Sequence, residues 1–430
     1  MSISPARIAA FEILKRIETE RAFSSILLPE FEAKLSGADR GLCHELTLGV
    51  LRRQMLLDRM IDQFAGDKKI DLAVRISLRL GLYQLKFLDR IPSHSAVNES
   101  VNLVNRAKKT SAKGFVNAVL RRSMREAFET EYVDETDRVA VETSHPRWLI
   151  EKWIAVLGLE DAIRLAVANN EAPSTAFRLT AKAPKGLGFA DSTPSSVVAG
   201  SFVAGSASRD MIDAAQKGEI YFQDEASQLT AASIDLMPND RFLDVCAAPG
   251  SKVTQIASRY SGGSNLIAAG DLHAHRVRFL AENCTSQKVG VEIVRYDAES
   301  VLPFQEGSFD ALLVDAPCSG TGTIRHNPEI RYFVQSDDLG TLVKKQRHIL
   351  QNASKLVRMG GYIVYSTCSV EPEEGEEVAA YFLSVNSNFE LADPCVPDRF
   401  RTQEGFARTF PHRDGMDGFF IARFRRTDKN

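Results

Sequence analysis

The clearest signal of the fold lies in one segment, Arg241-Phe242-Leu243-Asp244-Val245-Cys246-Ala247-Ala248-Pro249-Gly250-Ser251-Lys252. It is a short apolar run that passes through an acid into a loop of small residues, as a strand followed by a tight turn would. An amphipathic helix is predicted between Asp338 and Met359. Similar apolar runs recur at 265–270, 291–296, 309–314, 361–365 and 419–424. Strands that alternate with helices predict an α/β fold with a doubly wound, Rossmann-like, mostly parallel sheet.

Acids stand at or just after the ends of the first four predicted strands: Asp244, Asp271, Asp297 and Asp315. A single acid at a strand end commonly caps a turn or a helix. Ligands of open α/β sheets bind outside the carboxyl ends of the strands, so four such acids predict an edge that holds a polar ligand. An acid after the second strand suits a ribose, because a carboxylate accepts two hydrogen bonds from a diol.

The loop after the first strand indicates which nucleotide binds. It has a single glycine, Gly250, whereas a dinucleotide fold needs G-x-G-x-x-G and a phosphate loop needs G-x-x-x-x-G-K-[ST]. The loop therefore suits a nucleoside without phosphates. S-adenosyl-L-methionine is the common case, and NAD is the weaker alternative.

Six cysteines occur without a C-x-x-C pair, which argues against a structural zinc site and a disulfide framework: Cys43, Cys246, Cys284, Cys318, Cys368 and Cys395. We expect reduced thiols and no metal. Cys318 and Cys368 follow the fourth and fifth strands, so both thiols face one cleft if those strands are neighbours. A lone cysteine at a strand end usually serves packing. Two of them beside a nucleoside pocket favour catalysis.

Residues 5 to about 135 have apolar side chains at helical spacing and few glycines or prolines, which predicts a helical bundle. Seven basic residues and no acid occur from Arg106 to Arg125. From charge alone, a solvated helix face and a phosphate-contacting patch are both open. The basic residues are Arg106, Lys108, Lys109, Lys113, Arg121, Arg122 and Arg125.

The middle segment, residues 136–222, predicts a linker and a small α+β subdomain. Ser144 is a candidate helix cap with Pro146 in the first turn. Residues 177–180 could form a strand. The stretch 181–209 is rich in Ala, Gly, Ser and Pro, which favours loops.

The length of 430 residues suits two or three domains, and the formal net charge is −3. That charge excludes a histone-like coat on nucleic acid. It divides unevenly, because residues 1–135 hold 22 basic and 18 acidic residues, whereas residues 136–430 hold 31 and 38. No long apolar run or signal-peptide core occurs, so we expect a cytoplasmic protein without a membrane span, acting as a monomer.

Motifs along the second half resemble the RNA cytosine-5 methyltransferase family, the Nol1/Nop2/Sun group. They lie at residues 223–227, 244–252, 315–322, 365–370 and 414–420. Residues 79–85, residues 91–92 together with 98–101, and residues 114–120 resemble the NusB family of RNA-binding helical domains. With both parts in this order, the chain resembles the bacterial Sun/Fmu branch. Three residues depart from the family pattern: Ser251, His273 and Gly375.

The resemblance implies three regions: a NusB-like RNA-binding domain at 1–135, the small subdomain at 136–222, and a methyltransferase domain at 223–430. It implies methyl transfer from S-adenosyl-L-methionine to carbon 5 of a cytosine in 16S rRNA, through a covalent cysteine–cytosine adduct. Cys368 would be the nucleophile, and Cys318 would assist breakdown of the adduct and release of product.

Further site residues also follow from the resemblance. Asp315 would contact the cytosine ring edge and lie near the methionine part of the cofactor, and Lys252 would lie in the active site. Asp271 would hold the ribose, Asp297 the adenine amino group, and Arg276 would support the second-strand loop. The cofactor loop would comprise Cys246, Ala247, Ala248, Pro249, Gly250, Ser251 and Lys252.

Two other classes of protein stay open alongside the methyltransferase. One is a non-catalytic RNA-binding or assembly factor with a relic cofactor fold, which retention of both cysteines and the acids disfavours. The other is a nicotinamide oxidoreductase, which the single-glycine loop disfavours. Within the methyltransferases, transfer RNA is an alternative substrate to ribosomal RNA.

Overall fold

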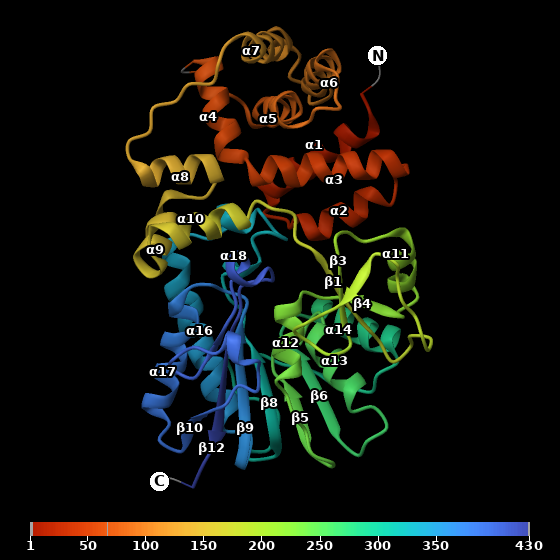
Figure 1. Ribbon diagram of the computed structural model, residues 1–430, viewed down its shortest axis with the longest axis vertical. Coiled ribbons are helices and arrows are strands. Elements are labelled where there is room, and N and C mark those ends of the chain that lie inside the picture. The colour runs from red at the N-terminus through yellow and green to blue at the C-terminus, as the bar shows by residue number, and fades with distance from the viewer. Residues whose placement is uncertain (1–2, 67, 429–430) are drawn as a thin grey trace. The chain divides into compact units, whose positions relative to one another are not determined.

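The computed structural model describes residues 3–66 and 68–428, which divide into two compact units (Figure 1). The helical unit runs to Ala172 and also takes in Ile324–Val334 from the second half of the chain. The sheet unit comprises Pro173–Thr323 and the chain from Gln335 onward. Among the described residues, no helix is long and apolar enough to cross a membrane.

The helical unit is built around α5 (Leu72–Phe87), whose side chains from Val74 to Gln84 are almost all buried. Close approach of the helices needs Gly81, because a Cβ there would lie 2.7 Å from a methyl of Leu120 on α7. The predicted bundle is therefore confirmed. The other elements of this unit are α1 (Pro5–Glu20), α2 (Ser24–Glu32), α3 (Gly37–Arg52), α4 (Gln54–Ala65), α6 (Ser93–Arg106), the 3-10 turn η1 (Thr110–Ala112), α7 (Lys113–Arg125), α8 (Glu135–Thr143), α9 (Arg147–Leu157), α10 (Leu159–Ala168) and α15 (Ile330–Phe333).

The segment Ile324–Val334 is integrated into the helical unit by buried polar groups. The Arg331 guanidinium donates to the carbonyl oxygens of Thr143 and Asn169 and to the Asn170 side chain. The Glu329 carboxylate accepts from the backbone N–H of Ser24. Because both charged side chains are fully buried, these hydrogen bonds are needed to offset their desolvation.

The predicted cap at Ser144 is wrong. Ser144 instead ends α8 in the left-handed conformation, with φ of 56°, and its hydroxyl accepts from the backbone N–H of Leu56. Pro146 stands at the N-cap of α9 rather than in its first turn. Because only His145 and Pro146 lie between Ser144 and the first residue of α9, Ser144 still belongs to the turn that ends α8.

The small α+β subdomain lies within the sheet unit. Its antiparallel sheet has the order β2-β3-β1-β4, and α11 (Arg209–Gln216) packs on it. Phe177, Met211 and Ile220 form its core. The prediction of loops throughout 181–209 is wrong in part, because two of these strands are too short for a periodic signal. The strands are β1 (Thr175–Leu179), β2 (Ser192–Pro194), β3 (Ser201–Ala204) and β4 (Ile220–Phe222).

The main sheet has the strand order β10-β12-β9-β8-β5-β6-β7, with β11 paired to β12. The run from β9 to β7 is parallel, and β12 inserts antiparallel between β9 and β10. This confirms the predicted α/β class. The strands are β5 (Arg241–Asp244), β6 (Leu266–Asp271), β7 (Glu292–Arg295), β8 (Phe309–Asp315), β9 (Val357–Thr367), β10 (Phe389–Ala392), β11 (Ala407–Arg408) and β12 (Phe420–Arg426).

Helices cover both faces of this sheet, as a doubly wound fold requires (Figure 1). Leu312 packs in one core with α16 and α17, whereas its neighbour Leu313 points to the other core with α12, α13 and α14. The helix predicted to reach Met359 ends at Ser354, since Val357 already starts β9. The helices are α12 (Glu225–Ala232), α13 (Ser251–Arg259), α14 (Ala274–Gln287), α16 (Ser336–Ser354), α17 (Glu376–Val385) and the short α18 (Pro411–Asp414).

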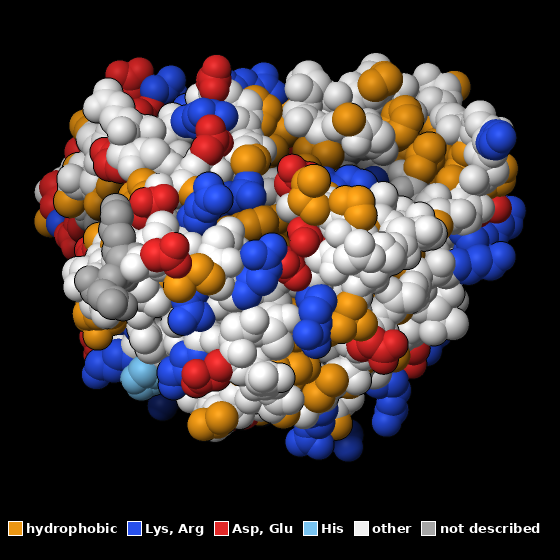
Figure 2. Space-filling view, turned by 90° about the horizontal axis from the view of Figure 1, so that it is seen from below, with side chains coloured by type: hydrophobic (Ala, Val, Ile, Leu, Met, Phe, Trp, Pro, Cys, Tyr) orange, Lys and Arg blue, Asp and Glu red, His pale blue; other side chains and the backbone are white. Residues whose placement is uncertain are grey.

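The surface carries charges of both signs. Lys and Arg side chains are interspersed with Asp and Glu over the face shown in Figure 2. This mixture agrees with the near-neutral formal charge of the chain. It fits a protein that contacts a charged partner locally rather than by its whole surface.

Candidate active site

The two cysteines predicted to share a cleft do lie together. Strands β8 and β9 are parallel neighbours, with Asp315 opposite Ser366, so the loops that follow them leave the same edge of the sheet. The Cys318 and Cys368 sulfur atoms are 3.3 Å apart, within hydrogen-bond distance for a thiol. The hydrogen bond with Cys368 and burial raise the pKa of the Cys318 thiol well above its usual range, and Glu374 and Asp315 raise it further.

A lysine–aspartate pair lies at the same strand ends. The Lys252 ammonium donates to Asp315 Oδ2 at 2.6 Å, and the Ser366 hydroxyl donates to Asp315 Oδ1 at 2.8 Å. Burial alone would lower the pKa of Lys252, but Asp315, Cys368 and Asp244 together outweigh burial and raise it. The lysine is therefore a cation at neutral pH, and its charge also acts on the nearby Cys368.

Glycines join three of the sequence motifs at one backbone crossing. The Gly322 N–H donates to the Cys368 carbonyl at 3.1 Å, and the Gly418 N–H donates to the Gly322 carbonyl at 2.8 Å. A Cβ at Gly322 would lie 1.9 Å from the Gly418 oxygen, so no larger residue fits without movement. The crossing thus holds the two cysteine loops and the 414–420 segment in one arrangement.

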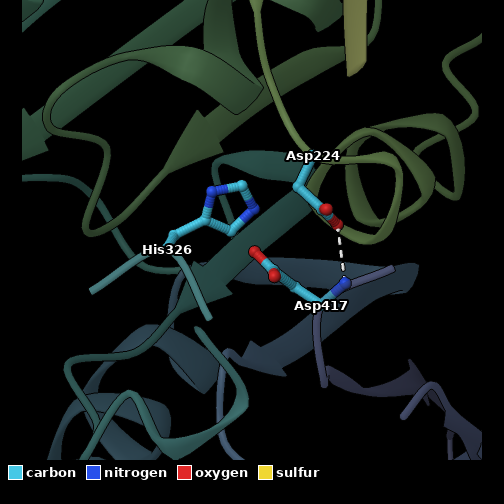
Figure 3. Close-up of side chains that lie close together, drawn as sticks. All are labelled: Asp224, His326 and Asp417. Carbon is cyan, nitrogen blue, oxygen red and sulfur yellow. Dashed lines mark hydrogen bonds between the residues drawn. The ribbon is translucent and has the colours of Figure 1, made fainter. Parts of the chain in front are cut away.

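The 414–420 segment is also tied to the residues before α12. The Asp224 carboxylate accepts from the backbone N–H of Asp417 at 3.0 Å (Figure 3). The same carboxylate caps α12 by accepting from the N–H of Ala226. A fourth motif, residues 223–227, is thereby attached to the site through one shared acceptor.

The candidate cofactor loop turns at Gly250, whose φ of 108° is a conformation that favours glycine. A Cβ at Gly250 would also lie 2.9 Å from a methyl of Leu280. Arg276 donates to the Ala248 carbonyl at 2.6 Å, so it contacts the first-strand loop. Its predicted support of the second-strand loop stays a prediction. Ser251, which departs from the family pattern, is the first residue of α13. Its backbone is helical, so the position does not require a glycine.

Asp271 lies at the end of β6 and is almost fully buried. Among the described residues, its oxygens accept two long hydrogen bonds, from the N–H groups of Ala248 (3.3 Å) and His273 (3.4 Å), and Arg276 lies 3.4 Å away. A carboxylate so placed retains acceptor capacity for a ribose diol. Phosphate-binding loops are absent from the sequence, so these residues fit a nucleoside such as that of S-adenosyl-L-methionine.

The remaining acids differ in environment. Burial, with a contribution from Asp315, raises the pKa of Asp244 to about 8. Its Oδ1 has no hydrogen-bond partner among residues 3–66 and 68–428. Asp297 is exposed after β7 and accepts from the N–H of Glu299, so it caps its own turn while staying accessible. Cys246 is not a candidate nucleophile, because burial and Asp244 raise the pKa of its thiol.

Sequence reasoning missed several residues that hold the cysteine loops. Glu374 is fully buried beside Cys318, and Arg408 donates to the carbonyl oxygens of Ser369 and Glu371 just after Cys368. The only signal for Glu374 was its place in the motif that ends in the unexpected Gly375. The structure explains that glycine, because a Cβ there would lie 2.8 Å from the Arg408 guanidinium.

The predicted basic patch lies on α6, on the turn that follows it and on α7 of the helical unit, and part of its charge is neutralised by ion pairs. Lys109 pairs with Asp71 at 2.8 Å, Arg122 with Glu126 at 2.6 Å, and Arg106 approaches Glu12 at 4.0 Å. Two lysines next to the predicted patch were not predicted, because they lie before α5, far in sequence from residues 106–125. Lys68 and Lys69 line a hollow of about 390 Å³ with Lys109 and Phe115.

Known proteins resemble both parts of the chain. Residues 231–425 match the family described as 16S rRNA methyltransferase RsmB/F, and residues 4–125 match the NusB family. The probable ribosomal RNA small subunit methyltransferase B of Bacillus subtilis (strain 168) is 31% identical, over 99% of this chain and 100% of its own length. The ribosomal RNA small subunit methyltransferase B of Pseudomonas putida is 33% identical over 97% of each chain. The crystal structure of PH0851 has a TM-score of 0.84 at 24% identity and covers 99% of each chain, which shows a common fold.

Proposed function

The chain belongs to the RsmB/F family of S-adenosyl-L-methionine-dependent methyltransferases, and on that premise we propose that it methylates carbon 5 of a cytosine in 16S rRNA. The observation that carries this proposal is the pair of thiols 3.3 Å apart, beside the Lys252–Asp315 ion pair. Methyl transfer to an oxygen or an exocyclic nitrogen needs no sulfur nucleophile. Transfer to carbon 5 does need one.

The chemistry explains why a thiolate is required. Carbon 5 of cytosine is a poor nucleophile until a thiolate adds to carbon 6, which makes carbon 5 enamine-like. Carbon 5 can then take the methyl group that the sulfonium of bound S-adenosyl-L-methionine supplies. Removal of the proton on carbon 5 and elimination of the thiolate restore the aromatic ring and free the enzyme. The target base must be unpaired or turned out of its stack.

We assign the two thiols different roles. Cys368 is the nucleophile, and the Lys252 ammonium lies near enough to interact with it electrostatically. Cys318, whose pKa is raised by Cys368, burial and Glu374, keeps its proton and assists breakdown of the adduct and release of product. Asp315, held by Lys252 and Ser366, contacts the cytosine ring edge.

In this proposal the target cytosine lies beside the cofactor in the active site, and the rest of the RNA is held by a different region. The loop 246–252 and Asp271 hold S-adenosyl-L-methionine, with Asp297 on its adenine and Arg276 supporting the loop. We assign methyl transfer to residues 223–430, of which Ile324–Val334 belongs to the helical unit, and we assign residues 136–222 a connecting role, with those up to Ala172 in the helical unit. Residues 1–135 dock the RNA through the basic patch and the adjacent Lys68 and Lys69. The basic side chains of the patch that form no ion pair with an acid among the described residues make the phosphate contacts.

The test is methyl transfer to rRNA by purified variants. Cys368→Ala abolishes transfer of a tritiated methyl group, because the adduct cannot form, and Cys318→Ala accumulates a denaturation-resistant protein–RNA band. Bisulfite sequencing of 16S rRNA from a strain without this protein identifies the cytosine. Full activity of Cys368→Ala, or a trapped band in that variant instead, contradicts the assignment. Loss of the modified cytosine from transfer RNA alone would make transfer RNA the substrate.

A further inference from the structure

One carboxylate in the sheet unit holds the backbone next to Cys318. Glu374 lies in the 3-10 turn η3 (Pro372–Glu374), and its side chain is fully buried. Its Oε1 accepts from the backbone N–H of Ser319 at 2.9 Å, and its Oε2 accepts from the Ser319 hydroxyl. The residue that follows Cys318 is therefore fixed by both its backbone and its side chain.

The residue that precedes Cys318 is held from the same place. The Gln346 amide on α16 donates to Glu374 Oε1 at 2.9 Å and to the Pro317 carbonyl at 3.0 Å. Tyr365 on β9 donates to the Glu374 carbonyl at 2.7 Å, which fixes the turn from behind. Glu374 and Gln346 thus hold the residues before and after Cys318 by hydrogen bonds to Pro317 and Ser319.

We propose that Glu374, with Gln346, is a positioning residue that holds Cys318 for breakdown of the covalent adduct and release of the methylated base. The inference rests on the proposed function. The Cys368 loop has anchors that Glu374 does not supply, namely the Arg408 contacts to the residues that follow the cysteine, while the Gly322 N–H ties the Cys368 carbonyl to the far end of the Cys318 loop. The two loops therefore share the crossing at Gly322 and differ in the groups that hold the residues next to each cysteine.

The charge of Glu374 supports the same division. The ionisable groups that act on Cys318 are Cys368, Glu374 and Asp315, and all three favour the neutral thiol. Lys252 instead acts on Cys368. The buried Glu374 carboxylate therefore favours the neutral form of the Cys318 thiol, which its proposed role needs.

The substitution Glu374→Gln keeps the size of the side chain and changes its hydrogen bonding. A carboxylate accepts from Ser319 and Gln346 at once, whereas an amide places its own N–H₂ against one of these donors. The residues next to Cys318 lose part of their hold, while the Arg408 contacts to the Cys368 loop are kept. Gln346→Leu is a milder second variant, because it frees Pro317 and leaves Ser319 bound to Glu374.

The experiment follows adduct and product separately, in full-length protein mixed with an rRNA substrate and tritiated S-adenosyl-L-methionine. In Glu374→Gln we expect the adduct to form at nearly the normal rate and then accumulate, while steady-state turnover falls by roughly tenfold or more, as loss of a charge-assisted hydrogen bond predicts. Gln346→Leu shifts the same balance less. Glu377→Gln, an exposed carboxylate on α17, is the matched control and should behave as wild type.

Each outcome decides the question. If Glu374→Gln and Gln346→Leu both lose adduct formation as well as turnover, the two residues have a general structural role and the proposal is overturned. Normal turnover in Glu374→Gln overturns it too. If Glu374→Gln does not fold, Gln346→Leu decides alone by the same criterion. Cys318→Ala is run in parallel. If it accumulates adduct while the Glu374 and Gln346 variants do not, only the positioning role of Glu374 and Gln346 fails. If Cys318→Ala forms no adduct, the proposed division of roles between the two cysteines fails, and the positioning role fails with it.

Discussion

Gly322→Ala is the sharpest structural test, because the glycine lies where three motifs cross. The new methyl carbon would lie 1.9 Å from the Gly418 oxygen and 2.9 Å from its Cα. A carbon and an oxygen normally approach to about 3.3 Å, so the two segments must separate by roughly 1.4 Å. That movement breaks the 2.8 Å hydrogen bond from Gly418 and weakens the 3.1 Å bond to Cys368.

The magnitude follows from these two bonds. Each contributes about 1 kcal/mol, and their buried groups are left unpaired, so we expect the free energy of unfolding of the sheet unit to fall by about 2–4 kcal/mol. For a unit of this size, about 2–4 °C of Tm is lost per kcal/mol, which gives roughly 4–16 °C. A shift of about 1 Å at Cys368 lowers the rate of methyl transfer by about 100-fold.

The assay pairs thermal denaturation with single-turnover methyl transfer. Gly340→Ala is the control, because Gly340 is exposed on α16 with no atom within 4 Å of a new Cβ. It should raise stability by up to about 1 kcal/mol and leave the rate unchanged, since alanine is the better helix former. A Gly322→Ala protein with wild-type Tm and rate would refute the argument that this crossing positions the cysteine loops.

Three further outcomes are expected. Arg331→Met removes the Arg331 donor from the buried carbonyl oxygen of Asn169 and from the Asn170 Oδ1, while the Thr143 carbonyl keeps its hydrogen bond from the Asn170 amide, so the helical unit loses about 1–3 kcal/mol, measured by hydrogen exchange across residues 324–334; unchanged protection there would contradict it. The raised pKa of Asp244, about 8 in the fold, means that its contribution to stability is complete below the unfolded value near 4 and is lost as pH rises through 8. Asp244→Asn should therefore gain Tm relative to wild type as pH rises from 4 to 8, and a difference independent of pH would exclude this. Lys69→Ala should weaken RNA binding and reduce its salt dependence by about one counterion without changing the maximal rate, measured by binding titrations at several salt concentrations; an unchanged salt dependence would remove Lys69 from the docking surface.

Local patterning was enough to predict much of this protein. The run 241–245 and its loop, the acids at successive strand ends, and the spacing of apolar residues in the first 135 positions depend on neighbours in the chain, so periodicity and turn chemistry reveal them. The sequence predicted that Cys318 and Cys368 lie together only if the strands before them are neighbours in the sheet. The strand order shows that these strands are neighbours.

What local patterns missed depends on partners that are distant in sequence. The strands β2 and β3 are too short to show a period, and Ser144 ends one helix rather than starting the next because the connection is short. Glu374 is an unremarked acid in the sequence and becomes an anchor only when Ser319 and Gln346 come within 2.9 Å of it. Arg331 lies among sheet-unit residues in sequence, yet its hydrogen bonds are to the helical unit.

The amino-acid order therefore sufficed for the α/β class, the helical bundle, the family resemblance and the identity of the candidate nucleophiles, since these follow from residue type and spacing. Tertiary structure alone decided which thiol carries a buried anion beside it, why position 375 is glycine, and which backbone groups hold each cysteine. The physical reason is that desolvation, charge and close backbone approach depend on distances in space. Gly322, Gly418 and Cys368 stand far apart in the chain, and only the packed strands of the sheet unit bring their backbones into contact.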